Sequence, residues 1–169
     1  NLKFSIIDGL QFIGTVLGEA PEFNFTYIGS ALTNVDLEIT TPAGDVVTIA
    51  NFAPEGSDDT GKRSPSGGRY FVDDIAGSVT AGSGSDVVVF DNPFQPAPRG
   101  IYTIKSVLVS GTSAAGSVLV QTDKLSSDPG QFGPIPQNLT TANPTSSVQV
   151  NLQAKTVTQR VQRVNKPKR

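Results

Sequence analysis

The chain has no cysteine, histidine, methionine or tryptophan among its 169 residues. Without histidine and cysteine it cannot supply a Ser-His-Asp or Cys-His relay, the usual nitrogen and sulfur ligands of zinc, or a disulfide. Its 11 Asp and 4 Glu suit calcium and, when paired in a cleft, glycoside hydrolysis. Three tyrosines and no tryptophan offer few flat platforms for sugar stacking. We therefore expect a protein that is not an enzyme, with carbohydrate left open as a ligand.

The charge is divided along the chain. Residues 1–154 carry seven bases and fifteen acids, a net charge of −8, whereas residues 155–169 carry six bases and no acid, a net charge of +6. A basic tail attracts polyanions, but the acidic body repels them. We therefore expect no nucleic-acid partner. Attraction between the tail and the acidic body of another copy favours a homo-oligomer or homopolymer, and the alternative is a solvated terminus.

Two features bear on the location of the protein. No apolar run approaches the roughly 18 residues that a membrane-spanning helix needs, so we expect no membrane span. Two N-glycosylation sequons begin at Asn24 and Asn138 and are compatible with secretion, although such triplets also arise by chance. We expect an extracellular or cell-surface protein.

The composition and the apolar pattern predict an all-β fold. The chain has 17 Gly and 12 Pro, and apolar residues alternate with polar ones in several segments, as in half-buried strands. About ten strands with polar connections predict a two-sheet β-sandwich of jelly-roll or immunoglobulin-like type. The clearest expected strands are 22–28, 34–41, 45–50, 69–75, 86–90, the pair 100–110 and 117–121, and 148–155.

The same pattern predicts three regions. They are a β-sandwich with apolar N-terminal strands over 1–125, a linker rich in Pro, Gly, Ser and Thr over 126–147, and a C-terminal strand with the basic tail over 148–169. The terminal strands either pair within their own subunit or are exchanged between subunits, where main-chain hydrogen bonds would hold a neighbour. The residues expected at such an interface are Leu2, Phe4, Ile6, Phe12, Val148, Val150, Leu152, Ala154, Arg160 and Arg163.

Four short pieces between residues 34 and 120 occur in the order found in a known family. They are DLEITTPAG at 36–44, DDIA at 73–76, GIYTI at 100–104 and GSVL at 116–119. With these pieces the chain resembles the jelly-roll P domain that follows the protease in proprotein convertases, and also pre-peptidase C-terminal domains. Tyr102 stands where the P domain usually has Trp. The resemblance implies a secreted sandwich, with Asp36, Asp73 and Asp74 as candidate calcium ligands.

Adjacent aspartates are a second reason to consider calcium. Asp58 and Asp59 lie in the polar segment 51–68, which we expect to be a loop, and Asp73 and Asp74 lie where an expected strand ends. Calcium takes six to eight oxygens, and such pairs are a natural source of carboxylates. The alternative is that these pairs belong to turns on a solvated surface. We expect calcium or no cofactor.

These observations lead to two hypotheses about function. The first is an extracellular structural protein, a self-assembling subunit of a surface filament, pilus-like fibre or sheath held together by strand sharing. The alternative is a calcium-stabilised accessory module of a secreted protein that binds carbohydrate or protein. Both use the same fold, so the fold alone does not choose between them.

Overall fold

Ten strands and one short helix make up the described part of the chain. A computed structural model describes residues 20–29, 32–52, 62–73, 83–92, 95–122, 130–152 and 156–160. The elements are β1 (Glu22–Gly29), β2 (Asn34–Thr40), β3 (Val46–Val47), α2 (Ile49–Phe52), β4 (Arg69–Val72), β5 (Ser83–Val89), β6 (Ile101–Ser110), β7 (Ser113–Gln121), β8 (Gln131–Thr140), β9 (Thr145–Asn151) and β10 (Thr156–Arg160). In these ranges no helix is long and apolar enough to cross a membrane.

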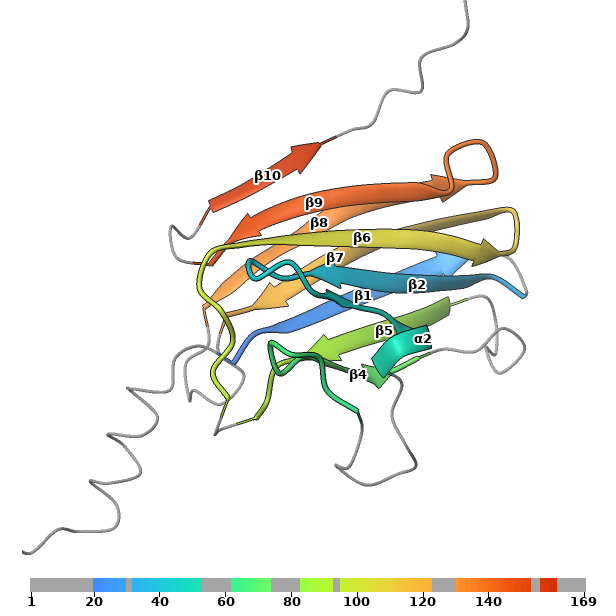
Figure 1. The fold of residues 1–169 in the computed structure, drawn as a ribbon. Helices are drawn as coiled ribbons and strands as arrows, with labels where there is room; N and C mark the ends of the chain where they lie inside the picture. The colour runs from blue at the N-terminus through green and yellow to red at the C-terminus, as the bar shows by residue number, and fades with distance from the viewer. Residues whose placement is uncertain are drawn as a thin grey trace, which may run out of the picture.

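The strands form two antiparallel sheets that pack face to face (Figure 1). Sheet A has the order β4-β5-β1-β7-β8, and sheet B has the order β10-β9-β6-β2-β3. The predicted all-β sandwich is therefore confirmed.

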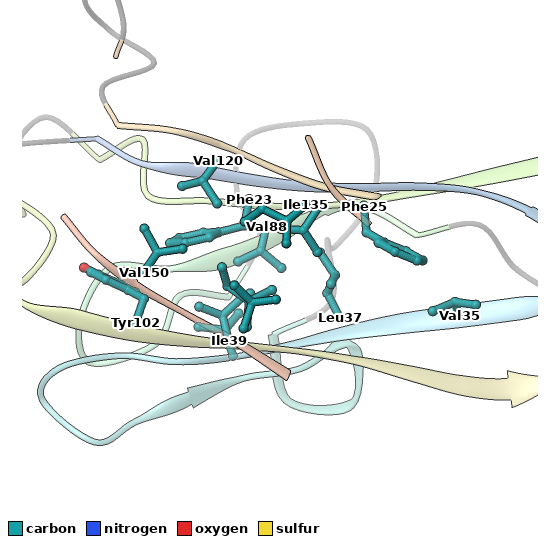
Figure 2. Close-up of a cluster of buried hydrophobic side chains, with 14 of the residues drawn as sticks. Phe23, Phe25, Val35, Leu37, Ile39, Val88, Tyr102, Val120, Ile135 and Val150 are labelled. Atoms are coloured by element: carbon teal, nitrogen blue, oxygen red, sulfur yellow. The ribbon is translucent and has the colours of Figure 1, made fainter. Parts of the chain in front are cut away.

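The core follows from the alternation along the strands. Along β1 and β2, side chains on the inner face are buried and those on the outer face are half-buried or exposed. Figure 2 shows residues of the two sheets facing each other: Phe23, Phe25, Val88, Val120 and Ile135 come from sheet A, and Val35, Leu37, Ile39, Tyr102 and Val150 from sheet B. The ring centroids of Phe23 and Tyr102 lie 5.2 Å apart, so an aromatic contact joins the two sheets.

The structure corrects the length of one expected strand and the pairing of two others. The strand expected over 45–50 is only two residues long and is followed by α2. The strands expected to pair over 100–121 lie in different sheets, since β6 pairs with β2 and β9 whereas β7 pairs with β1 and β8. The tight turn between them contains Gly111, whose φ is +87° and whose Cβ would collide with Thr33. Only glycine fits there.

The prediction of a linker over 126–147 is wrong. The region contains β8 and the beginning of β9. Ile135, Gln137 and Leu139 of β8 point inward and are buried, while Pro134 and Pro136 are exposed. Because β8 is the edge of sheet A, it tolerates prolines that a central strand would not. One sandwich therefore runs from β1 to β10, in place of a sandwich, a linker and a separate strand.

The C-terminal alternating strand also differs from the exchanged strand considered above. β9 lies inside sheet B between β6 and β10, and Val148, Val150 and Leu152 are buried in the core of the same chain. Their alternation therefore reflects burial between the two sheets of one subunit. Arg160 ends β10, the edge strand of sheet B. The remaining expected interface residues, Leu2, Phe4, Ile6, Phe12, Ala154 and Arg163, lie outside the described residues.

Candidate functional site

The site lies where the free edge of β2 meets sheet A. β3 pairs only with Ile39 and Thr40, so the first part of β2 has no partner strand on that side among the residues that the structure describes. The backbone amide of Leu37 donates instead to two side chains of sheet A, the Oη of Tyr70 at 2.6 Å and the Oδ2 of Asp86 at 3.1 Å. These bonds close one edge of the sandwich, because β4 and β5 supply the acceptors that a neighbouring strand would otherwise provide.

Tyr70 and Asp86 form a buried pair. Both residues are fully buried, and the Tyr70 hydroxyl donates to Asp86 Oδ2 at 2.5 Å. Burial, with the charge of Asp86 and the hydrogen bond to it, raises the pKa of Tyr70 far above its ordinary value. The hydroxyl therefore stays protonated and remains a donor to the carboxylate.

Three carboxylates converge at this edge. Asp36 comes from β2, Asp73 follows β4 directly and Asp86 comes from β5, and one oxygen of each lies within 4.8 Å of the others. Asp86 is buried and the other two are partly buried. Like charges this close repel each other, and a cation among them removes the repulsion. We name Asp36, Asp73 and Asp86 the acidic cluster.

A side-chain amide adjoins the acidic cluster. Asn34 precedes Asp36 by two residues on the same face of β2 and donates from Nδ2 to Asp36 Oδ1 at 3.1 Å. Its own Oδ1 is buried without a hydrogen-bond partner in the described part of the chain. Carboxylate and amide oxygens are the ligands that calcium takes, so these residues are of the kind that could hold a calcium ion together with water.

The structure describes two of the five aspartates that were predicted as calcium ligands. It brings Asp36 and Asp73 together, whereas Asp58, Asp59 and Asp74 lie outside the described residues. The sequence pattern does not reveal Asp86 as a site residue, because it predicts this residue only as the start of a buried apolar strand. An acid that begins such a run was the available signal, since a buried carboxylate needs a partner.

A separate ionic network fixes the connection before β4. Asp91 accepts hydrogen bonds from Arg63 and Arg69, each at 2.7 Å. Burial raises the pKa of Asp91, but the hydrogen bonds and charges of the two arginines outweigh it and lower the pKa to about 2. Both arginines neutralise Asp91, so this network is structural.

The three tyrosines are not available to a sugar ring. Tyr27, Tyr70 and Tyr102 are all buried, so none of the three tyrosines is a stacking platform. Asn138 is exposed on β8, whereas Asn24 is half-buried on β1 and accepts a hydrogen bond from the Ser85 hydroxyl at 3.3 Å. Of the two sequons, only the one at Asn138 presents its asparagine openly.

Comparisons with family models, with curated proteins and with solved structures find no match for this chain.

Proposed function

We propose that the protein is a non-enzymatic extracellular β-sandwich module whose open edge is stabilised by calcium. The observation that carries this proposal is the convergence of Asp36 from β2 in sheet B with Asp86 from β5 and Asp73 just after β4 in sheet A. An ion held there would link β2 to β4 and β5. In this proposal the cluster stabilises the fold and takes no part in bond chemistry.

A weak calcium site is consistent with the extracellular location that we propose. Two of its three carboxylates are partly exposed, and calcium sites of extracellular modules typically have dissociation constants of about 10⁻⁴–10⁻³ M. A site of that strength fills only where calcium is abundant, as it is outside cells. Binding to the folded state alone stabilises it by about 2.7 kcal/mol at 100 times the dissociation constant.

Thermal unfolding with added calcium or with chelator tests the proposal. Saturating calcium should raise Tm by roughly 5–10 °C, at about 2–4 °C per kcal/mol for a chain of this size. Asp36→Asn and Asp73→Asn should abolish the shift. Glu38→Gln is the matched control, because Glu38 is a partly buried acid on the same strand that pairs with Lys105 at 2.6 Å and should keep it. A wild-type Tm that responds to neither calcium nor chelator would contradict the proposal.

A second function, self-assembly by strand sharing, is favoured by the position of β10. β10 is an edge strand whose described pairing is with β9 alone. The other edges are poor templates for a neighbour, because β8 carries Pro134 and Pro136, and β3 and β4 have two and four residues. In this proposal β10 of one copy pairs with β9 of the next, and the basic tail is attracted to the acidic body.

Electron microscopy of three chains tests this second proposal. The full chain should form filaments, and a chain ending at residue 152 should not. A chain ending at residue 160 keeps β10 and lacks most of the tail charge, so filaments from it would assign assembly to the strand. Single particles from the full chain at high concentration would overturn strand sharing.

A further inference from the structure

The outer face of sheet A is uncharged along β7 and β8. Residues 113–121 and 131–140 contain no acidic or basic side chain. Strand alternation turns outward a set of residues that are all exposed, namely Ala115, Pro136, Asn138 and Thr140. On a soluble surface about 25–35% of the residues are ordinarily charged, which keeps that surface hydrated. This face therefore needs another source of hydration.

A glycosylation sequon lies within this face. It consists of Asn138, Leu139 and Thr140, the last three residues of β8. Leu139 is 1% exposed and packs in the core, so both of its neighbours point outward. N-glycosylation needs both of these neighbours, since it joins the sugar to the asparagine and recognises the threonine two residues later. The core thus holds the sequon with its two recognised side chains on the surface.

The space around Asn138 suits a bulky group. β8 is an edge strand, and the residue opposite Asn138 is Ala115 of β7, whose side chain is a single methyl group. The sequon at Asn24 is more confined, because β1 lies between β5 and β7. Asn24 is half-buried and stands between Val87 and Leu119. The structure therefore distinguishes two sequons that the sequence alone leaves equivalent.

We propose that Asn138 carries an N-linked oligosaccharide, which hydrates the outer face of sheet A. The co-reactant is an oligosaccharide linked to a polyprenyl diphosphate. The Nδ2 of Asn138 forms a bond to the anomeric carbon of the first sugar and gives up one proton. The bond from that carbon to the diphosphate oxygen breaks, and the lipid diphosphate leaves with the electron pair. The inference rests on the extracellular location proposed above, since a secreted chain is the kind that meets this donor, and the product is bulky and solubilising.

The oligosaccharide would also shield an exposed aliphatic side chain. Ile28 of β1 is 72% exposed and lies opposite Ala115, which in turn lies opposite Asn138. This row crosses three strands on the outer face, so Ile28 and Asn138 are about 10 Å apart at about 4.8 Å per strand. The acidic cluster lies toward the other edge of sheet A, beside β4 and β5 (Figure 1). The glycan and a calcium ion therefore occupy separate parts of the surface.

Secretion of the full chain from a eukaryotic cell line tests the proposal. The protein in the medium should exceed the mass of its polypeptide by one oligosaccharide, and peptide-N-glycosidase should remove this excess. Asn138→Gln and Thr140→Ala should lose the excess completely, whereas Thr140→Ser keeps the hydroxyl and should retain it. Asn24→Gln is the matched control at the other sequon and should also retain it. Light scattering should show that Asn138→Gln begins to associate at a protein concentration at least about twofold below that of the wild type.

Three results would overturn the proposal. The first is a chain that reaches the medium without a glycan, which would refute the modification and not the location. The second is a glycan that Asn138→Gln retains. The third is an equal tendency of the glycosylated chain and Asn138→Gln to associate, which would refute the role in hydration. The calcium dependence of Tm is measured separately on Asn138→Gln, so failure here leaves the proposed functions standing.

Discussion

Removing the Tyr70 hydroxyl isolates the contact that closes the β2 edge. In Tyr70→Phe the buried ring stays and Asp86 loses the hydrogen bond donated at 2.5 Å. The Leu37 amide keeps Asp86 as an acceptor at 3.1 Å, so no new unpaired donor is created. A hydrogen bond to a charged group contributes about 1.5–3 kcal/mol. We therefore expect a loss of that size in the free energy of unfolding, or roughly 3–12 °C in Tm.

Urea unfolding followed by circular dichroism, with chelator present, measures this loss without a contribution from calcium. Tyr102→Phe is the matched control, because Tyr102 is also buried and its hydroxyl donates to the neutral carbonyl of Pro98 at 2.6 Å. A neutral bond contributes about 0.5–1.5 kcal/mol, so this variant should be the less affected. If the two variants lose equal stability, the reasoning that Asp86 is a buried charge held by Tyr70 is refuted.

Three further predictions concern other parts of the sandwich. Because Asp91 has a pKa of about 2, below its value of about 3.9 in the unfolded chain, its stabilisation is present above pH 4 and is lost as the pH falls toward 2. Asp91→Asn should lower the free energy of unfolding by about 1–2 kcal/mol at pH 7, after allowance for solvent screening. It should also reduce the loss of stability between pH 4 and pH 2, which urea midpoints at several pH values would measure. An unchanged pH dependence would contradict this prediction. Gln137 is buried with neither amide atom hydrogen-bonded in the described structure, so Gln137→Leu should stabilise the fold by about 1 kcal/mol in urea unfolding, and a lower midpoint argues against this. Gly116→Ala would place a Cβ 2.7 Å from Phe25 Cζ and should lower stability by about 1–3 kcal/mol in the same assay, whereas an unchanged midpoint would show that the core relaxes.

The sandwich could be predicted because a strand that is buried on one face alternates apolar and polar residues in the sequence. Phe23, Phe25 and Tyr27 alternate with polar residues, and so do Val35, Leu37 and Ile39. This alternation is weaker in β8, which contains prolines that are tolerated only because the strand lies at an edge. Alternation also says nothing about the partner of a strand, so the assignment of β6 and β7 to different sheets could not be derived from it.

The candidate site could be predicted only in part, because local signals in the sequence do not show which residues the tertiary structure brings together. Asp36 and Asp73 were suggested by a resemblance and by an adjacent pair of acids, which are local signals. Asp86 joins them because β5 crosses behind the free edge of β2, and that position depends on the whole topology. The convergence of three carboxylates is therefore a property of the tertiary structure.

The place of β1 in the middle of sheet A determines when the chain can begin to fold. β1 pairs with β5 and with β7, so Glu22 lies opposite Val89 and Gln121. β2 likewise depends on β6 for its longest pairing, since Thr40 lies opposite Thr103. At a synthesis rate of roughly 5–20 residues per second, β1 has no partner strand for several seconds after it is made. Among the described strands, the first half of the chain therefore has only the short β2–β3 pairing until β5 is made.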